Sequence, residues 1–399
     1  SARPPGSPGR RRSSPAAVGG RTMASGDAAA SAAAATRLFC AEYSPGLYQA
    51  LSDDRVRVDA YRRALERRVR GKRVLDLGTG PVALLAVLAA RAGAARVIAV
   101  EVSEEVAAAA RRCVEAEGLA GVIEVIVGYS TQAAFPEVDV VIHELVGSLA
   151  SEEGIALVLD DIRQRVPAVI DAGRPKWAIP RRTATWVAPI SLHVPCAGAA
   201  GERGRARGRA PQARELRLPV GFVVPSAARL GEPKEAEACD AEQLPALEER
   251  RELRWTIAGA STLTGFVCAP RIELDDVDTI DAWKEQTHWR HVALLLPSAR
   301  LLAAGDEVAL RVATDRQRFP VVFSFEARLR QRNGASELLL AEAVVAMEVP
   351  DEPAEALPAA PAERAAARKR PAAASVGAVA KRRPAAAAAM RRPSGAGCR

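Results

Sequence analysis

Two glutamates nine residues apart, Glu144 and Glu153, are the leading candidates for chemistry in this sequence. They flank a Gly-containing segment in residues 143–154, which read His-Glu-Leu-Val-Gly-Ser-Leu-Ala-Ser-Glu-Glu-Gly. A guanidinium group is a planar fork of five N–H donors, and two carboxylates can hold it from two sides through charge-assisted hydrogen bonds. Glu152, one residue earlier, competes for the second position. The segment predicts a site for an arginine side chain, and the alternative is a pair of surface acids.

A glycine-rich turn upstream has the composition of a nucleotide site. Residues 74–80 read Val-Leu-Asp-Leu-Gly-Thr-Gly, an apolar run that ends in Gly78 and Gly80. Glycines allow a tight turn and close approach of a ligand. Asp76 would repel a pyrophosphate but attract the cationic amino group of S-adenosylmethionine. Glu101, at the end of the next expected strand, can accept hydrogen bonds from both ribose hydroxyls. These residues predict S-adenosylmethionine as the cofactor.

These candidates need a scaffold, and the apolar pattern of residues 73–142 predicts one. Short β-rich runs (RVLDL, RVIAVEV, IEVIV and VDVVIHEL) alternate with helical runs (LLAVLAARAG and EEVAAAARRCVEAEG). That alternation is typical of a parallel sheet built from βαβ units, which binds ligands at the carboxyl ends of its strands. We expect an α/β, Rossmann-like cofactor domain over residues 37–177, with the glutamate segment at the carboxyl end of the fourth strand.

The pattern changes after about residue 178. Six strand-like runs follow without clear helices between them, which predicts a mostly β, barrel-like substrate domain over residues 178–350. A low-complexity insert near residues 197–216 interrupts these strands. Its Arg and Gly content predicts an exposed loop.

Both ends of the chain are of low complexity. Residues 1–36 and 351–399 are rich in Ala, Pro and Arg and are expected to be disordered. Met23 is a more ordinary start than Ser1, so residues 1–22 are interpreted as a translated leader. We exclude both ends from the folded part.

Positive charge is concentrated in these ends. Residues 1–22 hold five Arg and residues 364–399 hold ten Lys or Arg, with no acids in either range. Because the net charge is +8, residues 23–363 carry −7. Basic tails suit nucleic acid and an acidic body suits a cationic substrate, although the tails could serve solubility alone. The basic runs at 368–370 and 381–383 resemble nuclear import signals.

Cysteine usage and hydropathy exclude several classes of protein. The six cysteines are scattered and form no CxxC pair, which disfavours a structural zinc site or a disulfide framework and fits a reducing compartment. No apolar run reaches the roughly 18 residues that a membrane helix needs. We therefore expect no metal, no membrane association, and a cytoplasmic or nuclear location.

The glutamate segment resembles the double-glutamate loop of the protein arginine methyltransferases. In that family the two glutamates, here Glu144 and Glu153, hold the substrate guanidinium and orient one nitrogen towards the transferred methyl group. The Glu-Leu-x-Gly-Ser motif is most similar to the motif in the branch of the family that makes symmetric dimethylarginine. The resemblance covers roughly residues 38–350 and is strongest over residues 73–154.

A second segment, upstream of the glycine turn, is similar to motifs of the same family. Residues 51–61 (LSDDRVRVDAY) resemble the helix that closes over the cofactor. By that match Arg57 pairs with the cofactor carboxylate and Asp54 lies beside the active site. The FCAEY run, with Phe39 and Tyr43, resembles the aromatic lid motif, so Tyr43 is a candidate for substrate contact. The alternative is an ordinary amphipathic helix with exposed charges.

A third segment, Thr287-His288-Trp289, resembles the loop that reaches from the barrel to the active site. By that match His288 pairs with Asp54 and helps to take up the released proton, and Trp289 walls the arginine channel. The alternative is a barrel strand with a chance histidine. The Thr-His-Trp motif is more usual in family members that make asymmetric dimethylarginine. Leu51 holds the product-setting position, where Met or Phe is usual, so the product type stays open.

The resemblance implies an S-adenosylmethionine-dependent enzyme that methylates guanidino nitrogens of protein arginines. Arg-Gly-rich proteins are candidate substrates, and a homodimer is the implied assembly. Residues 203–209 (RGRARGR) have that substrate composition themselves, which suggests self-methylation. One alternative is a class I methyltransferase for a small molecule or RNA, in which Glu144 and Glu153 have no special role. The other is a non-catalytic binding protein of this fold, favoured by Val82 at the third glycine position of the turn.

Overall fold

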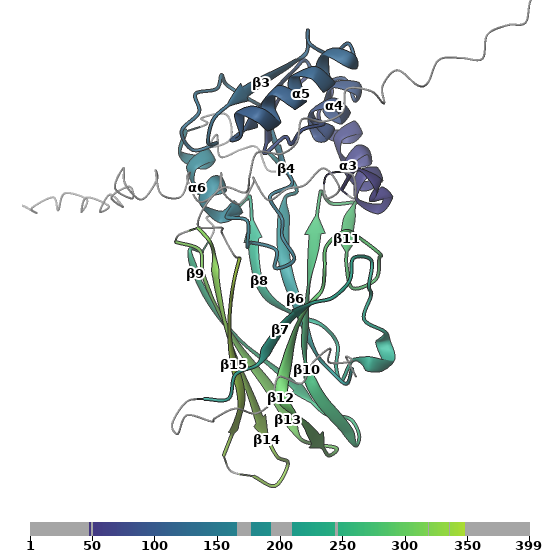
Figure 1. Cartoon of the computed structure of the whole chain (residues 1–399), viewed down its shortest axis with the longest axis vertical. Coiled ribbons are helices and arrows are strands. Elements are labelled where there is room, and N and C mark those ends of the chain that lie inside the picture. The colour runs from purple at the N-terminus through teal and green to yellow at the C-terminus, as the bar shows by residue number, and fades with distance from the viewer. Residues whose placement is uncertain are drawn as a thin grey trace, which may run out of the picture. The chain divides into compact units, whose positions relative to one another are not determined.

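The computed structural model describes most of the chain between residues 48 and 347 (Figure 1). The chain divides into two units, residues 1–355 and 356–399, and every described residue belongs to the first. The described residues are Tyr48 and the ranges 51–165, 177–192, 210–243, 246–317, 319–334 and 336–347. The two basic ends, the RGRARGR run and the candidate Tyr43 lie outside them.

A five-stranded parallel sheet with strand order β3-β2-β1-β4-β5 forms the centre of the first domain. Its strands are β1 (Arg73–Leu77), β2 (Arg96–Glu101), β3 (Ile123–Val127), β4 (Val140–His143) and β5 (Ala178–Ile179). The β-rich runs of residues 73–142 coincide closely with β1 to β4. The prediction of an α/β, Rossmann-like domain is therefore confirmed.

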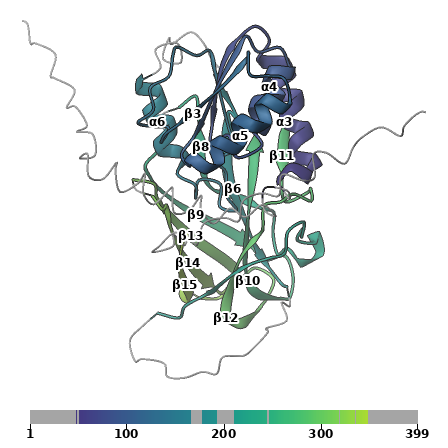
Figure 2. The same cartoon turned by 45° about the horizontal axis from the view of Figure 1, so that its top comes forward.

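Helices cover both faces of this sheet. They are α3 (Arg55–Arg68), α4 (Leu84–Arg91), α5 (Glu104–Ala116) and α6 (Ile155–Arg165). Side chains alternate along β1, so that Val74 packs in one core with α3, α4 and α5 while Leu75 packs in another with α6. Figure 2 shows α6 on the left of this domain and α3 and α4 on the right. None of the helices that the structure describes combines the length and apolar character required to cross a bilayer.

Side chains at the helix starts explain where two of these helices begin. The carboxylate of Asp54 caps α3 by accepting a hydrogen bond of 3.1 Å from the amide of Arg57. Ser103 caps α5 in the same way by accepting from the amide of Val106 at 3.4 Å. Asp54, a candidate for the site, therefore also determines where α3 starts.

Two antiparallel sheets form the second domain (Figure 1). One has the order β7-β12-β10-β6-β8 with β11 paired to β10, and the other has the order β15-β14-β13-β9. The strands are β6 (Arg182–Ile190), β7 (Arg214–Arg217), β8 (Lys234–Asp240), β9 (Glu248–Thr256), β10 (Ser261–Glu273), β11 (Thr279–Asp281), β12 (Val292–Leu302), β13 (Glu307–Asp315), β14 (Val322–Arg330) and β15 (Leu338–Ala346). Phe266 and Leu294 from the first sheet share a core with Phe323 from the second. The prediction of a mostly β second domain is confirmed.

Strand β7 differs from the sequence prediction. Part of the insert near residues 197–216 was expected to be an exposed loop, yet Arg214 to Leu216 belong to β7 and pair with β12, with Leu216 opposite Ala293. β7 lies at the edge of its sheet, so it needs few apolar side chains and leaves no clear alternating pattern. This short strand becomes part of the wall of the candidate site.

Ion pairs join α3 to the second domain. Arg67 contacts Asp275 at 2.7 Å, and Arg63 contacts Asp278 at 2.6 Å. Both aspartates lie between β10 and β11, and the Thr287-His288-Trp289 segment follows β11. The helix that begins with Asp54 is therefore held against the loop region that carries His288.

Candidate active site

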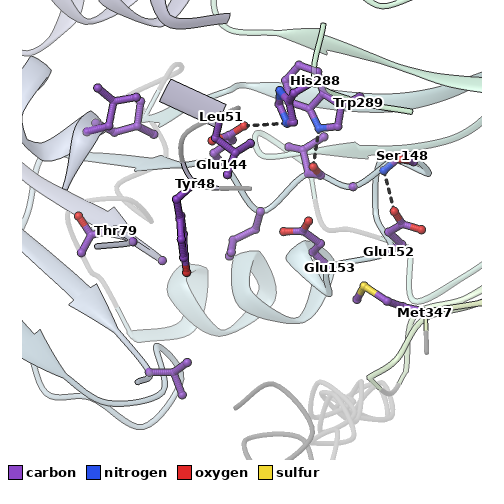
Figure 3. A pocket seen from close by; sticks show the side chains of 18 of the residues that line it. Tyr48, Leu51, Thr79, Glu144, Ser148, Glu152, Glu153, His288, Trp289 and Met347 are labelled. Atoms are coloured by element: carbon purple, nitrogen blue, oxygen red, sulfur yellow. Dashed lines mark hydrogen bonds and ion pairs between the residues drawn. The ribbon is translucent and has the colours of Figure 1, made fainter. Parts of the chain in front are cut away.

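One cavity of about 910 Å³ contains nearly all of the described site candidates (Figure 3). It begins at the carboxyl ends of β1, β2 and β4 and extends to residues of the second domain. The candidates that line it are Arg57, Asp76, Gly78, Gly80, Glu101, Glu144, Glu153, His288 and Trp289. Asp54 lies behind His288 rather than in the cavity wall.

The glycine turn after β1 shapes the first part of the cavity. Gly78 and Gly80 have φ angles of +70° and +67°, a conformation that favours glycine. A Cβ atom on Gly78 would lie 3.0 Å from the Leu145 side chain. The hydroxyl of Thr79 donates to Asp76 at 2.6 Å and holds its carboxyl at the turn. The backbone thus leaves room at the position where the sequence predicts the cofactor.

Two buried carboxyl groups provide the electrostatics of this part. Burial raises the pKa of Asp76 to about 7. Burial also raises the pKa of Glu101, even though its carboxylate accepts hydrogen bonds from the amides of Gly80 and Ser103, both at 3.1 Å. Burial makes ionisation of these two acids unfavourable when no ligand is bound. They therefore suit a ligand that has a cationic group and hydroxyl donors.

Arg57 and Glu144 form the junction between the two parts of the cavity. The guanidinium of Arg57 donates to Glu144 Oε2 and to the carbonyl of Leu51. Arg57 Nε and Glu144 Oε1 are both buried, and neither has a hydrogen-bond partner among the described residues. An unpaired donor suits a ligand carboxylate and an unpaired acceptor suits a ligand N–H group. The pair therefore fits a carboxylate-bearing cofactor on one side and a guanidinium on the other.

These observations fit S-adenosylmethionine. Asp76 would take its amino group, Glu101 its ribose hydroxyls and Arg57 Nε its carboxylate. The positive-φ glycines provide the close approach that an adenosyl group needs.

The two competing glutamates of the loop after β4 lie differently. Glu153 lines the cavity, and Figure 3 shows its side chain projecting into the space beside Glu144. Glu152 instead accepts a hydrogen bond of 2.6 Å from the amide of Ser148 and pairs with Arg217 at 3.0 Å. Glu153 is therefore the better candidate for the second carboxylate that binds a guanidinium.

The Thr287-His288-Trp289 segment reaches the cavity from the second domain. The Nδ1 atom of His288 lies 2.9 Å from Asp54 Oδ2, and its Nε2 atom lies 3.5 Å from Glu144 Oε1. The hydrogen bonds that Asp54 accepts from His288 and Arg57 outweigh its burial and lower its pKa. The carboxylate thus stays ionised and holds the imidazole beside Glu144.

Trp289 is anchored to the glutamate loop. Its indole Nε1 donates to the carbonyl of Val146 at 2.7 Å, and its ring lies 4.0 Å from that of His288, centroid to centroid. The tryptophan is buried yet lines the cavity. It links the loop of the first domain to the second domain.

Several lining residues were not identified from the sequence. They are Tyr48, Glu215, Arg217, Phe319 and Met347. Tyr48 lies over Gly80, where a Cβ atom would be 3.4 Å from its ring. An aromatic residue near the expected lid could have suggested Tyr48. Glu215 and Arg217 lie on β7, Phe319 lies between β13 and β14, and Met347 follows β15, and none of these four belongs to a local motif.

The charge of the cavity favours a cation. Its wall contains three arginines, Arg57, Arg217 and Arg290, against six carboxyl groups from Asp76, Glu101, Glu144, Glu152, Glu153 and Glu215. Carboxyl groups therefore outnumber arginines in this wall by six to three. A positively charged substrate is attracted to such a wall.

Sequence comparison identifies a matching domain and several curated relatives. Residues 74–166 match the model of a methyltransferase domain. A probable protein arginine N-methyltransferase 6.1 of Oryza sativa subsp. indica is 35% identical over 189 residues, which is 45% of this chain and 46% of the relative. Protein arginine N-methyltransferase PRMT10 of Arabidopsis thaliana is 34% identical over 193 residues, 45% of this chain and 47% of the relative. The chain thus spans about half the length of these curated relatives.

A shorter match is bacterial. An arginine N(omega)-methyltransferase of Streptomyces achromogenes subsp. streptozoticus is 39% identical over 118 residues, 28% of this chain and 32% of the relative.

Solved structures show the same fold. The crystal structure of Arabidopsis thaliana protein arginine methyltransferase 10 superposes with a TM-score of 0.62 at 20% identity, covering 77% of this chain and 99% of that one. The Trypanosoma brucei PRMT1 enzyme–prozyme heterotetrameric complex with AdoHcy gives 0.60 at 20% identity, covering 75% and 98%. Residues 74–166 thus match a methyltransferase domain, the curated relatives that match about half of their length are protein arginine N-methyltransferases, and the two solved structures share the fold of this chain.

Proposed function

We propose that this protein transfers methyl groups from S-adenosylmethionine to guanidino nitrogens of arginine side chains in proteins. The observation that carries the proposal is that Glu144 and Glu153 face the same cavity as Asp76 and Glu101. A guanidinium held by the first pair would lie next to a cofactor held by the second. In the same proposal Arg57 binds the cofactor carboxylate, Asp54 orients His288, and Trp289 walls the guanidinium site.

Glu144 and Glu153 would act on the nucleophile. Each carboxylate accepts N–H donors of the guanidinium and draws positive charge onto the nitrogens that it binds. The third nitrogen then keeps electron density for attack and is oriented by the other two. S-adenosylmethionine, when bound, supplies a sulfonium methyl group that such a nitrogen can accept.

His288 would receive the proton that the methylated nitrogen releases. It is held by Asp54 and lies 3.5 Å from Glu144, so a proton can reach it through that carboxylate. Trp289 would wall the guanidinium site and keep water from it.

The test is methyl transfer from labelled S-adenosylmethionine to a panel of Arg-Gly-rich peptides and free L-arginine. Glu144→Gln should lower kcat/KM by ~10²–10³, because one partner of a charged pair is lost. The matched control is Glu66→Gln, an exposed glutamate on α3 that should keep parental activity.

The outcomes separate the candidate functions. Label on peptide arginine that falls in Glu144→Gln supports the proposal, and parental activity in that variant contradicts it. Cofactor binding without label on any arginine would indicate a methyltransferase for another substrate. No binding and no label would indicate a non-catalytic member of the fold.

We further propose a nuclear as well as cytoplasmic location, based on the basic runs at 368–370 and 381–383. The same tail is proposed to contact nucleic acid through its charge. Replacing the six basic residues by Gln should abolish nuclear accumulation of the full chain. Unchanged accumulation would remove the basis for this assignment.

Two further properties extend the proposal. The resemblance to protein arginine methyltransferases supports a homodimer, which light scattering of the full chain would detect as twice the monomer mass.

The RGRARGR run at 203–209 has the composition of an Arg-Gly substrate. Mass spectra after incubation with S-adenosylmethionine alone should show added methyl groups within this run.

A further inference from the structure

Glu152 is held inside the protein by a residue of the second domain. Its side chain is only 4% exposed, and its two oxygens accept hydrogen bonds from Nη1 and Nη2 of Arg217 at 3.2 and 3.0 Å. Arg217 is the last residue of β7, the edge strand that pairs with β12. A fork of two parallel hydrogen bonds fixes orientation as well as distance.

The same glutamate fixes the backbone of the loop. Glu152 Oε1 accepts from the amide of Ser148 at 2.6 Å, which closes the turn between them. A Cβ atom on Gly147 would lie 2.1 to 2.6 Å from three atoms of the Glu152 side chain. The turn therefore fits around Glu152, and a side chain at position 147 would displace Glu152 from this position.

Glu152 and Glu153 point in different directions as a result. Figure 3 shows Glu152 beside Ser148 while Glu153 projects towards the cavity near Glu144. Neighbouring glutamates are chemically identical, so the sequence cannot assign which of them faces the substrate. The contact with Arg217 distinguishes them.

Other side chains of the second domain support the loop at adjacent points. The amide of Ala150 donates to Thr185 at 2.8 Å, and the amide of Ser151 donates to Glu237 at 3.3 Å. The hydroxyl of Ser151 accepts from Arg316 Nε at 3.1 Å, and Arg316 also pairs with Glu237. These contacts hold the middle of the loop, whereas Arg217 holds the side chain next to Glu153.

We propose that Arg217 is a positioning residue that acts through Glu152 to direct Glu153, rather than Glu152, to the substrate guanidinium. The inference rests on the proposed function. Without Arg217, a carboxylate that is 4% exposed loses its counter-charge, and burying an unpaired charge is costly. Glu152 would turn towards solvent or the cavity, and the turn at Ser148 would open. A displacement of about 1 Å in a reacting group can cost about 10²-fold in rate.

The test compares Arg217→Met with the parent in two measurements. For peptide methylation we expect kcat to fall about 10- to 100-fold, while the Kd for S-adenosylhomocysteine stays unchanged because Asp76, Glu101 and Arg57 are untouched. Amide hydrogen exchange, measured without substrate, should show loss of protection in residues 147–153 only. The control is Arg328→Met, which removes an arginine of similar exposure paired with Glu326 far from this loop and should change neither measurement.

A second variant tests whether Arg217 acts through Glu152. In Arg217→Met with Glu152→Gln, the neutral amide needs no counter-charge and its oxygen can still accept from Ser148, so much of the lost activity and protection should return. No rescue, or an Arg217→Met variant with parental kinetics and exchange, would overturn the proposal. If the parent methylates no arginine, the proposed function fails, and the exchange data alone still decide whether Arg217 holds the loop.

Discussion

Asp76 combines a proposed role in cofactor binding with an environment that disfavours its charge. Its side chain is buried beside the glycine turn, and its pKa is raised to about 7 because burial penalises the charged form. Near pH 7 only about half of the molecules carry the charge that would bind a cofactor amino group. Cofactor affinity should therefore depend on pH through this residue.

We expect S-adenosylhomocysteine to bind roughly fivefold more tightly at pH 7.5 than at pH 6, because the ionised fraction of Asp76 grows through its pKa of about 7 while the ligand amino group remains mostly protonated. Isothermal titration calorimetry at several pH values measures this. Asp76→Asn should bind weakly and with little pH dependence. Equal affinity of the parent at both pH values would show that Asp76 does not bind the amino group.

Helix α3 is the element that joins the two halves of the site. Its start carries Asp54 and Arg57, which contact His288 and Glu144. Its last turns carry Arg63 and Arg67, which pair with Asp278 and Asp275. The start of the helix thus contacts two candidate site residues, and its last turns contact aspartates of the second domain. Hydrogen bonds from the arginines and nearby amides outweigh burial and lower the pKa of both aspartates.

Arg67→Met should lower the free energy of unfolding by about 1–3 kcal/mol, because two largely buried carboxylates lose a charged donor. Arg62→Met is the control, since Arg62 pairs within the exposed face of the same helix, and it should change stability by less than about 0.5 kcal/mol. Urea denaturation at pH 7 measures both. The lowered pKa values mean that this stabilisation is present above pH 3.8 and is lost as the pH falls through the folded-state values. Equal effects of the two variants would contradict a role for the α3 ion pairs.

At the scale of the whole described unit, the two domains share one cavity and several buried contacts. Trp289 bonds to Val146, Arg316 bonds to Ser151, and Arg217 pairs with Glu152, each joining the second domain to the loop after β4. A loop held from the other domain cannot keep its shape if that domain unfolds. The domains should therefore unfold together.

Calorimetric unfolding of the full chain should show one transition from these domains. S-adenosylhomocysteine at 100 times its Kd should stabilise that whole transition by about 2.7 kcal/mol. In Asp76→Asn the shift at the same ligand concentration should be much smaller. Two transitions, with only the first moved by the ligand, would show that the domains are energetically independent.

Much of this protein could be predicted from local sequence. The strands β1 to β4 follow apolar runs whose period is set by their own residues, and Asp76, Gly78, Gly80 and Glu101 lie at the ends of those strands. The sequence also places Glu144 and the adjacent pair Glu152 and Glu153 around the loop after β4, although it does not assign which of the pair faces the cavity. These features depend on neighbours within a few residues, so the order of residues is sufficient to identify them.

Other features depend on residues that are far apart in the chain. β7 is stabilised by pairing with β12 rather than by its own pattern. Glu152 turns away from the cavity because Arg217, 65 residues later, supplies its counter-charge. His288 and Asp54 meet across 234 residues, a contact that only a family resemblance had suggested. Side-chain direction is set by packing and charge partners, and the tertiary structure alone decides which partners meet.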